Sequence, residues 1–137
     1  MGNRRTALAA GEMVTRILVP ESSTSGTSSF LKLGARKYLV ISISMVAARL
    51  VVSRDGRIEE VAIAVGACSE VAQRMKEAEA ALRGARLDDD WRSLLRSEHF
   101  EVLAPIDDVR ATANYRNTAT LELVQRAVAN AMPEASS

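Results

Sequence analysis

Few side chains in this 137-residue sequence could carry out acid–base or nucleophilic chemistry. His99 is the only histidine, and with the carboxylates of Asp107 and Asp108 it could form a general base. Serine or cysteine in a recognisable nucleophile setting is missing, so a partly exposed histidine at a helix end is the simpler interpretation. A small hydrolase that uses these three residues is therefore the weakest of three hypotheses; the two stronger ones are described below.

Two other features could bind a metal or react. Residues 88–90 are three consecutive aspartates, whose oxygens suit Mg²⁺ or Ca²⁺, but consecutive side chains diverge and the start of a helix explains them equally well. Cys68 lies before an expected helix, where a thiol can become reactive, although a small buried side chain is the alternative. As the only cysteine, it excludes an internal disulfide and favours the reducing cytoplasm. The scattered glycines form no phosphate-binding cluster.

Composition limits the classes of partner. Apolar residues make up 47% and charged residues 26%, which fits one compact domain with a real core. A formal net charge of +1 gives no field to hold a polyanion or an anionic bilayer. The most apolar stretch, residues 38–52, contains Arg49 and is too short to cross a membrane as a helix. We expect a cytoplasmic protein that binds neither nucleic acid nor membrane.

The elements that must position these residues begin with strands. Residues 13–19 are rich in β-branched side chains and predict a short strand that Pro20 ends. Residues 21–29 are small and polar, which predicts a flexible linker. Residues 30–33 and 38–52 predict a short and a long strand.

Two local features refine the strand prediction. The apolar parity of the long strand changes near Met45 and Val46, which predicts a bulge or bend there. Asp55-Gly56 suits a tight turn, so residues 57–65 should return as the second arm of a hairpin.

Helices follow the strands. Ser69 could cap a helix over residues 70–83, which Gly84 would end, and a shorter helix is expected from the aspartates to about His99. A last helix should begin at Thr112 or Asn114 and stop at Pro133, with an apolar stripe of Leu121, Val124, Val128 and Met132. This order predicts an α+β fold: an antiparallel sheet of three to four strands covered on one face by about three helices.

Three segments in this order resemble a known family. Residues 29–48 contain the pattern Phe-x-Lys-x-x-x-Arg, residues 63–84 run from Ile-Ala-Val-Gly-Ala into a helix, and residues 105–127 begin Pro-Ile-Asp-Asp-Val-Arg-Ala-Thr-Ala-Asn-Tyr-Arg. Together they resemble the C-terminal domain of the FAD-binding (medium) subunit of molybdenum hydroxylases, the xanthine dehydrogenase and carbon monoxide dehydrogenase family. Residues 6–20 are similar to the end of the preceding flavin-binding domain.

The resemblance implies a division of the chain and a role. Residues 28–133 would be a CO dehydrogenase flavoprotein C-terminal domain, and residues 1–27 the tail of a missing FAD-binding domain plus a linker. In this family, electrons pass from a molybdenum centre through [2Fe-2S] clusters to FAD. The implied partners are the FAD-binding domain, the molybdenum-cofactor subunit and the 2Fe-2S subunit. Because the loops that hold FAD are missing, the chain alone should bind no cofactor and be inactive.

The resemblance also implies roles for particular residues. Lys32 and Arg36 would face FAD in the complete subunit, where a cation stabilises negative charge on the reduced flavin, and Lys37 would serve the same surface. A solvated strand lysine, or ion pairs with acids such as Glu59 or Glu60, are the alternatives. The last segment would lock the final helix through charge-assisted hydrogen bonds and is expected to be structural; its residues are Asp107, Asp108, Arg110, Tyr115 and Arg116.

A second hypothesis belongs to another class. An α+β sheet leaves one face in need of cover, so the chain could be a stand-alone module that self-associates without flavin, as a homo-oligomer. Exposure of Leu50, Val52, Val61 and Ile63 in a monomer would favour this module.

Overall fold

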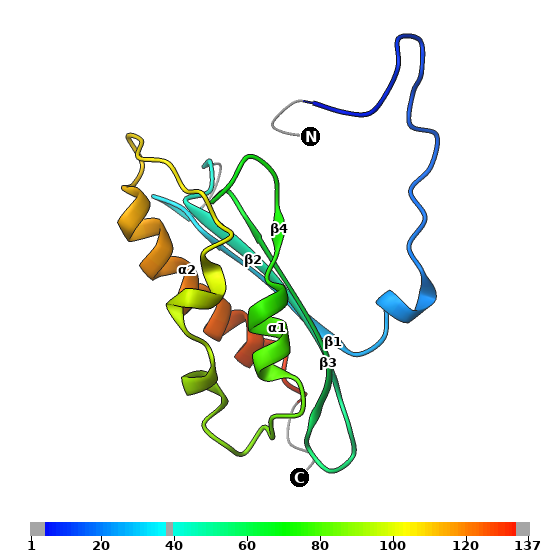
Figure 1. The fold of residues 1–137 in the computed structure, drawn as a ribbon, viewed down its shortest axis with the longest axis vertical. Coiled ribbons are helices and arrows are strands. Elements are labelled where there is room, and N and C mark those ends of the chain that lie inside the picture. The colour runs from blue at the N-terminus through cyan, green and yellow to red at the C-terminus, as the bar shows by residue number, and fades with distance from the viewer. Residues whose placement is uncertain (1–4, 38–39, 134–137) are drawn as a thin grey trace.

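The chain folds into a four-stranded antiparallel sheet with helices on one face, as described by a computed structural model for residues 5–37 and 40–133 (Figure 1). The strands lie in the order β1-β2-β3-β4. Their bounds are β1 Thr27–Leu33, β2 Ser44–Val52, β3 Ile58–Gly66 and β4 Gln73–Arg74. The predicted α+β architecture is confirmed.

The cover of the sheet consists of two α-helices and short 3₁₀ turns. The helices are α1 Lys76–Leu82 and α2 Ala113–Asn130, and the turns are Trp91–Leu94 and Ser97–Phe100; a further 3₁₀ turn, Glu21–Ser23, lies in the exposed segment before β1. Helix α2 packs across β1 and β2, whereas α1 packs on β3. Between the helices and the sheet lies one core; its fully buried side chains include Val46, Leu50, Ile58, Ile63, Val65, Met75, Leu82, Val124 and Val128.

The β2–β3 hairpin forms as predicted. Gly56 has a φ of +80°, in the left-handed region that glycine adopts without strain, and the Ser53 N–H donates to the Arg57 carbonyl at 2.8 Å. The bulge expected near Met45 and Val46 is wrong, because pairing is regular there and the register shifts between Val51 and Val52 instead.

The apolar pattern changes near Met45 without a bulge, because the strand is shorter than expected. Strand β2 begins at Ser44, so Ile41 and Ile43 precede it, while residues 38–39 lie outside the described residues. Ser44 itself occupies the buried row and its hydroxyl lies 2.8 Å from that of Thr120. A hydrogen-bonded polar pair therefore takes a position where the pattern suggested a change of face.

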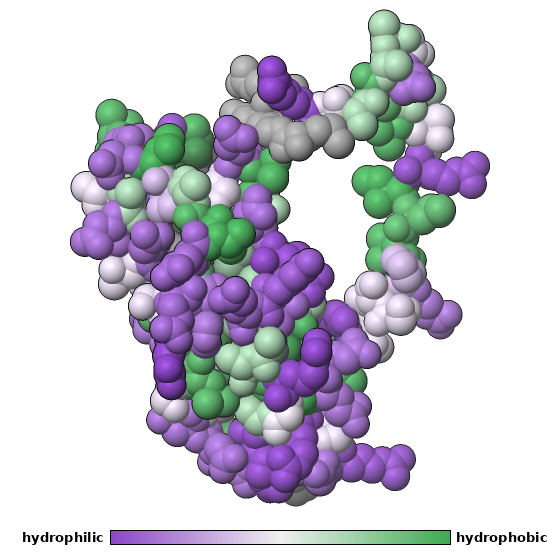
Figure 2. All heavy atoms as spheres, viewed as in Figure 1, coloured by the Kyte–Doolittle hydropathy of each residue, from purple (hydrophilic) through white to green (hydrophobic). Residues whose placement is uncertain are grey.

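The prediction of a strand over residues 13–19 is also wrong for this chain. These residues are in no strand, and the N-terminal segment stands apart from the sheet with its apolar side chains exposed (Figures 1 and 2). A strand needs a partner for its backbone groups, and β propensity alone does not supply one.

Strand β1 starts three residues before the predicted position. Gly26 precedes it with a φ of +85°, and a Cβ there would come within 2.0 Å of the Leu50 carbonyl oxygen. Only glycine allows this close approach of the backbone to β2. The polar linker is correspondingly shorter than residues 21–29.

Helix α1 is half as long as predicted, because part of its sequence pairs with the sheet. Residues 73–74 form β4, and Ser69 caps no helix. Met75, Ala78 and Leu82 are buried as the helical stripe requires, but Val71 is exposed. Gly84 follows the helix with a φ of +83°, as expected.

The side of β3 that faces away from β2 has hydrogen-bond partners at three places. At one end, Ile58 exchanges backbone hydrogen bonds with Gly84 and Ala85. In the middle, the Glu79 carboxylate accepts the Ile63 N–H at 2.8 Å, and at the other end β4 pairs with the strand.

The segment after the aspartates forms two 3₁₀ turns in place of the predicted helix. Of the three residues expected on its apolar side, Trp91 and Leu95 are buried in the core, whereas Leu94 is exposed; Phe100 is also buried. Helix α2 begins after Thr112, whose hydroxyl accepts the Tyr115 N–H at 3.2 Å, so one of the two predicted starts is confirmed. Among the described residues, no helix is both long and apolar enough to span a bilayer.

Candidate functional site

The outer face of the sheet, opposite the helices, carries no covering element in Figure 1. Three rows of side chains cross it, and the middle row joins Phe30 of β1 to Ala47 of β2 and Ala64 of β3. Ala62 lies beside this row, and all three alanines are small. These alanines therefore form the bottom of a shallow hollow of about 440 Å³. Phe30 lies at the edge of this hollow and is 61% exposed.

Arg49 fixes one rim of this hollow. Its guanidinium donates to the Ser25 carbonyl at 2.9 Å and to the Glu60 carboxylate at 3.0 Å. One side chain thus ties the segment before β1 to β3 across the outer face. An aromatic ring over small residues with an arginine at the rim can bind a flat, partly anionic ligand by stacking and charge.

Lys32 lies two residues beyond Phe30, on the same face of β1. Its ammonium group donates to the Val40 carbonyl at 2.6 Å. Lys32, Arg36 and Lys37 line one hollow of about 400 Å³, so the structure brings the three predicted cations together at this end of β1. Lys32 is exposed and hydrogen-bonded, and its role toward FAD stays a prediction.

Close packing shapes the same end of the sheet. A Cβ on Gly34 would lie 2.4 Å from the Val40 side chain, so the chain passes there only because residue 34 has none. Met45 similarly lies across Gly66 on the outer face, where a Cβ would meet its methyl carbon at 2.4 Å.

A second group of charged residues lies at the start of α2. The Arg116 side chain is buried, with its guanidinium donating to the carbonyls of Ile43 at 2.6 Å and Ala67 at 3.3 Å. Its other terminal nitrogen lies 2.8 Å from the Asp108 carboxylate, while Nε is buried with no hydrogen-bond partner in the described structure. Arg116 thus joins α2 to the segments before β2 and after β3.

Asp108 is the anionic centre of this group. Its Oδ1 accepts the backbone N–H of Arg110 at 2.8 Å and that of Ala111 at 3.2 Å, besides the bond from Arg116. The Arg110 N–H is the largest influence on the carboxyl, and these bonds outweigh partial burial, so the pKa of Asp108 is lowered from 3.8 to about 2.

The other residues of the predicted signature divide into two groups. Asp107 accepts the Ala113 N–H at 2.5 Å at the start of α2, and Arg110 forms a 2.5 Å ion pair with Asp108. Tyr115 is half-exposed on α2 and lines a groove of about 350 Å³ with Leu33 and Leu123. Asp107 and Arg110 therefore support the helix start, and the Tyr115 side chain faces elsewhere.

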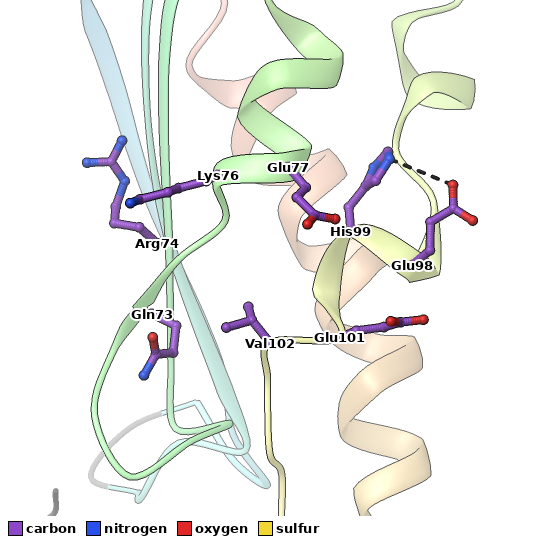
Figure 3. Close-up of a pocket in the computed structure, with 8 residues that line it drawn as sticks. All are labelled: Gln73, Arg74, Lys76, Glu77, Glu98, His99, Glu101 and Val102. Atoms are coloured by element: carbon purple, nitrogen blue, oxygen red, sulfur yellow. Dashed lines mark ion pairs between the residues drawn. The ribbon is translucent and has the colours of Figure 1, made fainter.

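His99 lies in a different pocket, of about 420 Å³, shown in Figure 3. Its Nδ1 accepts the Arg96 N–H at 3.3 Å, and its Nε2 lies 3.9 Å from the Glu98 carboxylate. Asp107 and Asp108 bind the start of α2 instead, so the structure does not assemble the proposed general base. The pocket is lined by Gln73, Arg74, Lys76, Glu77, Glu98, His99, Glu101 and Val102.

The remaining candidates, Cys68 and the three aspartates, have surroundings that suit a structural role. Cys68 is buried, with its sulfur 3.4 Å from the Thr120 hydroxyl. Asp88 pairs with Arg86 at 2.9 and 3.0 Å, and Asp90 precedes a 3₁₀ turn. Across residues 5–37 and 40–133, no group of three or more His, Cys, Asp or Glu side chains is placed to hold a metal ion.

An uncovered sheet face was expected from the sequence, but the residues that form it, Phe30 and the alanines, were not identified. A signal was present, because small residues alternate with large ones along β3 and their row must lie on the face away from the core. A second missed feature is the ion pair of Glu79 with Arg74, at 2.7 Å. Burial raises the pKa of the Glu79 carboxyl, but the hydrogen bonds from Arg74 and the Ile63 N–H outweigh it and lower the pKa overall.

Comparisons with known proteins find similar chains and similar folds in oxidoreductases. The chain is 28% identical over 132 residues to the nicotine 6-hydroxylase medium subunit of Paenarthrobacter nicotinovorans, covering 96% of the chain and 45% of that protein. A reconstituted CO dehydrogenase from Oligotropha carboxidovorans matches with a TM-score of 0.77 and 28% identity, over 96% of the chain and 45% of the matched one. Quinoline 2-oxidoreductase from Pseudomonas putida 86 matches with a TM-score of 0.67 and 26% identity, over 77% and 36%.

The fold is thus an α+β domain found within flavoprotein subunits of larger oxidoreductases. Residues 29–131 match the CO dehydrogenase flavoprotein C-terminal domain, and the chain belongs to this family. The chain spans less than half the length of the relatives it matches.

Proposed function

We propose that this chain acts as the C-terminal domain of the FAD-binding medium subunit of a molybdenum hydroxylase, and that its outer sheet face closes over the flavin. The observation that carries the proposal is the uncovered hollow floored by Ala47 and Ala64, with Phe30 exposed at its edge. Family membership supports the class of subunit. FAD, when bound, supplies the redox chemistry, and this domain contributes shape and charge.

The residues of the outer face fit a flat conjugated ring. Small side chains let a planar group approach the sheet closely, and an exposed Phe30 can stack on it. Lys32, on the same face, would place a positive charge near the ring and stabilise negative charge that develops there. Arg36 would contribute to the same field, since it lines the hollow at the end of β1 with Lys32.

The N-terminal segment supports a place for the domain within a longer subunit. Two relatives match nearly the whole chain, whereas the C-terminal domain family begins at residue 29. Met13, Ile17 and Leu18 are 79 to 83% exposed, which is unfavourable for an apolar segment unless another part of the protein covers it. We assign residues 1–27 to the tail of the FAD-binding domain and a linker.

In the complete assembly, the molybdenum-cofactor subunit and the 2Fe-2S subunit would be the further partners, delivering electrons to FAD. The relatives are described as acting on nicotine, carbon monoxide or quinoline. This variety among similar proteins supports the proposal that substrate choice lies outside the chain.

The alternative, a self-associating module, loses the feature that would favour it. Leu50, Val61 and Ile63 are buried under the helices, and Val52 is partly buried. The face that needs cover is the opposite one, with Phe30 and the alanines.

A co-expression experiment tests the proposal. The chain is produced with the FAD-binding part of a medium subunit from a relative, and the flavin retained after gel filtration is measured by absorbance. We expect retention to require the chain and to fall with Phe30→Ala. Tyr115→Ala is the matched control, because Tyr115 is also an exposed aromatic residue but lies on α2. Equal retention in the two variants would contradict the assignment of the outer face.

A further inference from the structure

The short segment that leads into β2, residues 40–43, is held from both faces of the sheet by cationic side chains. From the outer face, the Lys32 ammonium donates to the Val40 carbonyl at 2.6 Å. From the helix side, the Arg116 guanidinium donates to the Ile43 carbonyl, also at 2.6 Å. A backbone bond of 2.8 Å from the Ile43 N–H to the Leu33 carbonyl fastens the same segment to the end of β1.

The two cations differ in how firmly they are fixed. Arg116 is 2% exposed, and Asp108 holds it in an ion pair of 2.8 Å. Asp108 is in turn fixed by two backbone N–H groups of its own turn. Lys32 is exposed, and its flexible ammonium follows the carbonyl it binds. The position of residues 40–43 is therefore set from the α2 side.

We infer that Arg116 is a positioning residue that places Lys32 through residues 40–43. Arg116 sets the Ile43 carbonyl, the segment carries this position to Val40, and Val40 holds the Lys32 ammonium. The start of α2 is thus coupled to the outer face through the sheet. The importance of this coupling for flavin rests on the proposed function, whereas the coupling itself belongs to this chain alone.

Chemical labelling of the lysines tests this inference on the chain as it is. The sequence contains three lysines, Lys32, Lys37 and Lys76, and Lys76 in α1 serves as the internal reference. Reductive methylation with ¹³C-formaldehyde, followed by NMR, gives the rate at each amine. Hydrogen exchange at the Ile43 amide reports on the segment directly.

The decisive comparison uses two arginines that share one carboxylate. Arg110 also pairs with Asp108, but within the described part of the chain its side chain donates to Asp108 and to no carbonyl of residues 40–43, so Arg110→Ala is the matched control. In Arg116→Ala we expect methylation of Lys32 to rise severalfold relative to Lys76, and exchange at Ile43 to rise about tenfold, because a charge-assisted hydrogen bond is lost. Adding ethylguanidinium, which matches the deleted group, should reverse both changes.

Three outcomes would overturn the inference. They are an unchanged Lys32 rate, an equal rise at Lys32 and Lys76, and equal effects of Arg110→Ala and Arg116→Ala. If Arg116→Ala fails to fold, Asp108→Asn replaces it, since it weakens the hold on Arg116 without removing the guanidinium. The same changes at Lys32 and Ile43 are then expected at smaller size, and their absence would count against the inference. Flavin is absent throughout, so this result stands or falls independently of flavin binding.

Discussion

The two faces of the sheet are built from the same strands and differ in the size of their side chains. On the inner face, Leu50 and Ile63 are fully buried under the helices. On the outer face, alanines occupy the matching positions, and Phe30 stands exposed. Alternation along a strand therefore encodes a core on one side and an exposed surface on the other; the core determines stability, and the exposed surface is free to serve the binding proposed above.

Truncation on the inner face should have the largest effect on stability. Ile63→Ala removes a side chain with no exposed surface and leaves a cavity beneath α1, so we expect a loss of about 2–5 kcal/mol in the free energy of unfolding. Urea denaturation followed by circular dichroism measures it. Phe30→Ala on the outer face should change the same quantity by less than about 0.5 kcal/mol. Similar losses in both variants would remove the distinction between the faces.

The ion pair of Asp108 with Arg116 should make the fold less stable as the pH falls into the acid range. The pKa of Asp108 is lowered to about 2 in the folded chain, so its ionised form stabilises the fold above the ordinary value of 3.8. That contribution is lost as the pH falls through 3.8 toward 2. Asp108→Asn should therefore cost most stability near neutral pH, and the difference from the original chain should shrink in acid.

Thermal melts of both chains between neutral and acidic pH measure this difference. Asp90→Asn, which changes an exposed carboxylate before a 3₁₀ turn, is the control and should give a curve parallel to the original. A constant offset for Asp108→Asn across the whole range would contradict the prediction.

The smallest effect on stability is expected for filling the outer hollow. Ala64→Leu adds bulk to a face that nothing covers, so the free energy of unfolding should change by less than about 0.5 kcal/mol. Flavin retention in the co-expressed subunit should nevertheless be lost, because the new side chain occupies the floor. Ala64→Ser keeps the side chain small and should retain flavin. If the leucine variant retains it equally, the hollow is not the contact.

Local signals in the sequence predicted the hairpin, the start of α2 and the end of α1. Each depends on neighbouring residues: Asp55-Gly56 for the turn, Thr112 for the cap and Gly84 for the left-handed residue. The start of α1 could not be predicted, because Gln73 and Arg74 pair with β3 instead of joining the helix. Partners distant in sequence override local helix propensity there.

For the candidate site too, the sequence indicated which residues matter but not how they are connected. Asp108 and Arg116 are brought together, Lys32 lies with Arg36, and Tyr115 lies apart; the roles that the resemblance implied for them stay predictions. The link between them could not be read from the sequence, since it passes through the carbonyls of Val40 and Ile43, which every residue type possesses. The pattern of side chains along a sequence does not show which backbone carbonyls will accept hydrogen bonds.

The two edges of the sheet differ in length, which limits how copies could join. Strand β1 ends the sheet on one side with seven residues, and β4 ends it on the other with two. Joining strand to strand without end requires two edges on every copy that are long enough to pair. The edge strand β4 has only two residues, so contact through the longer β1 edge would favour a pair of copies over a growing fibre.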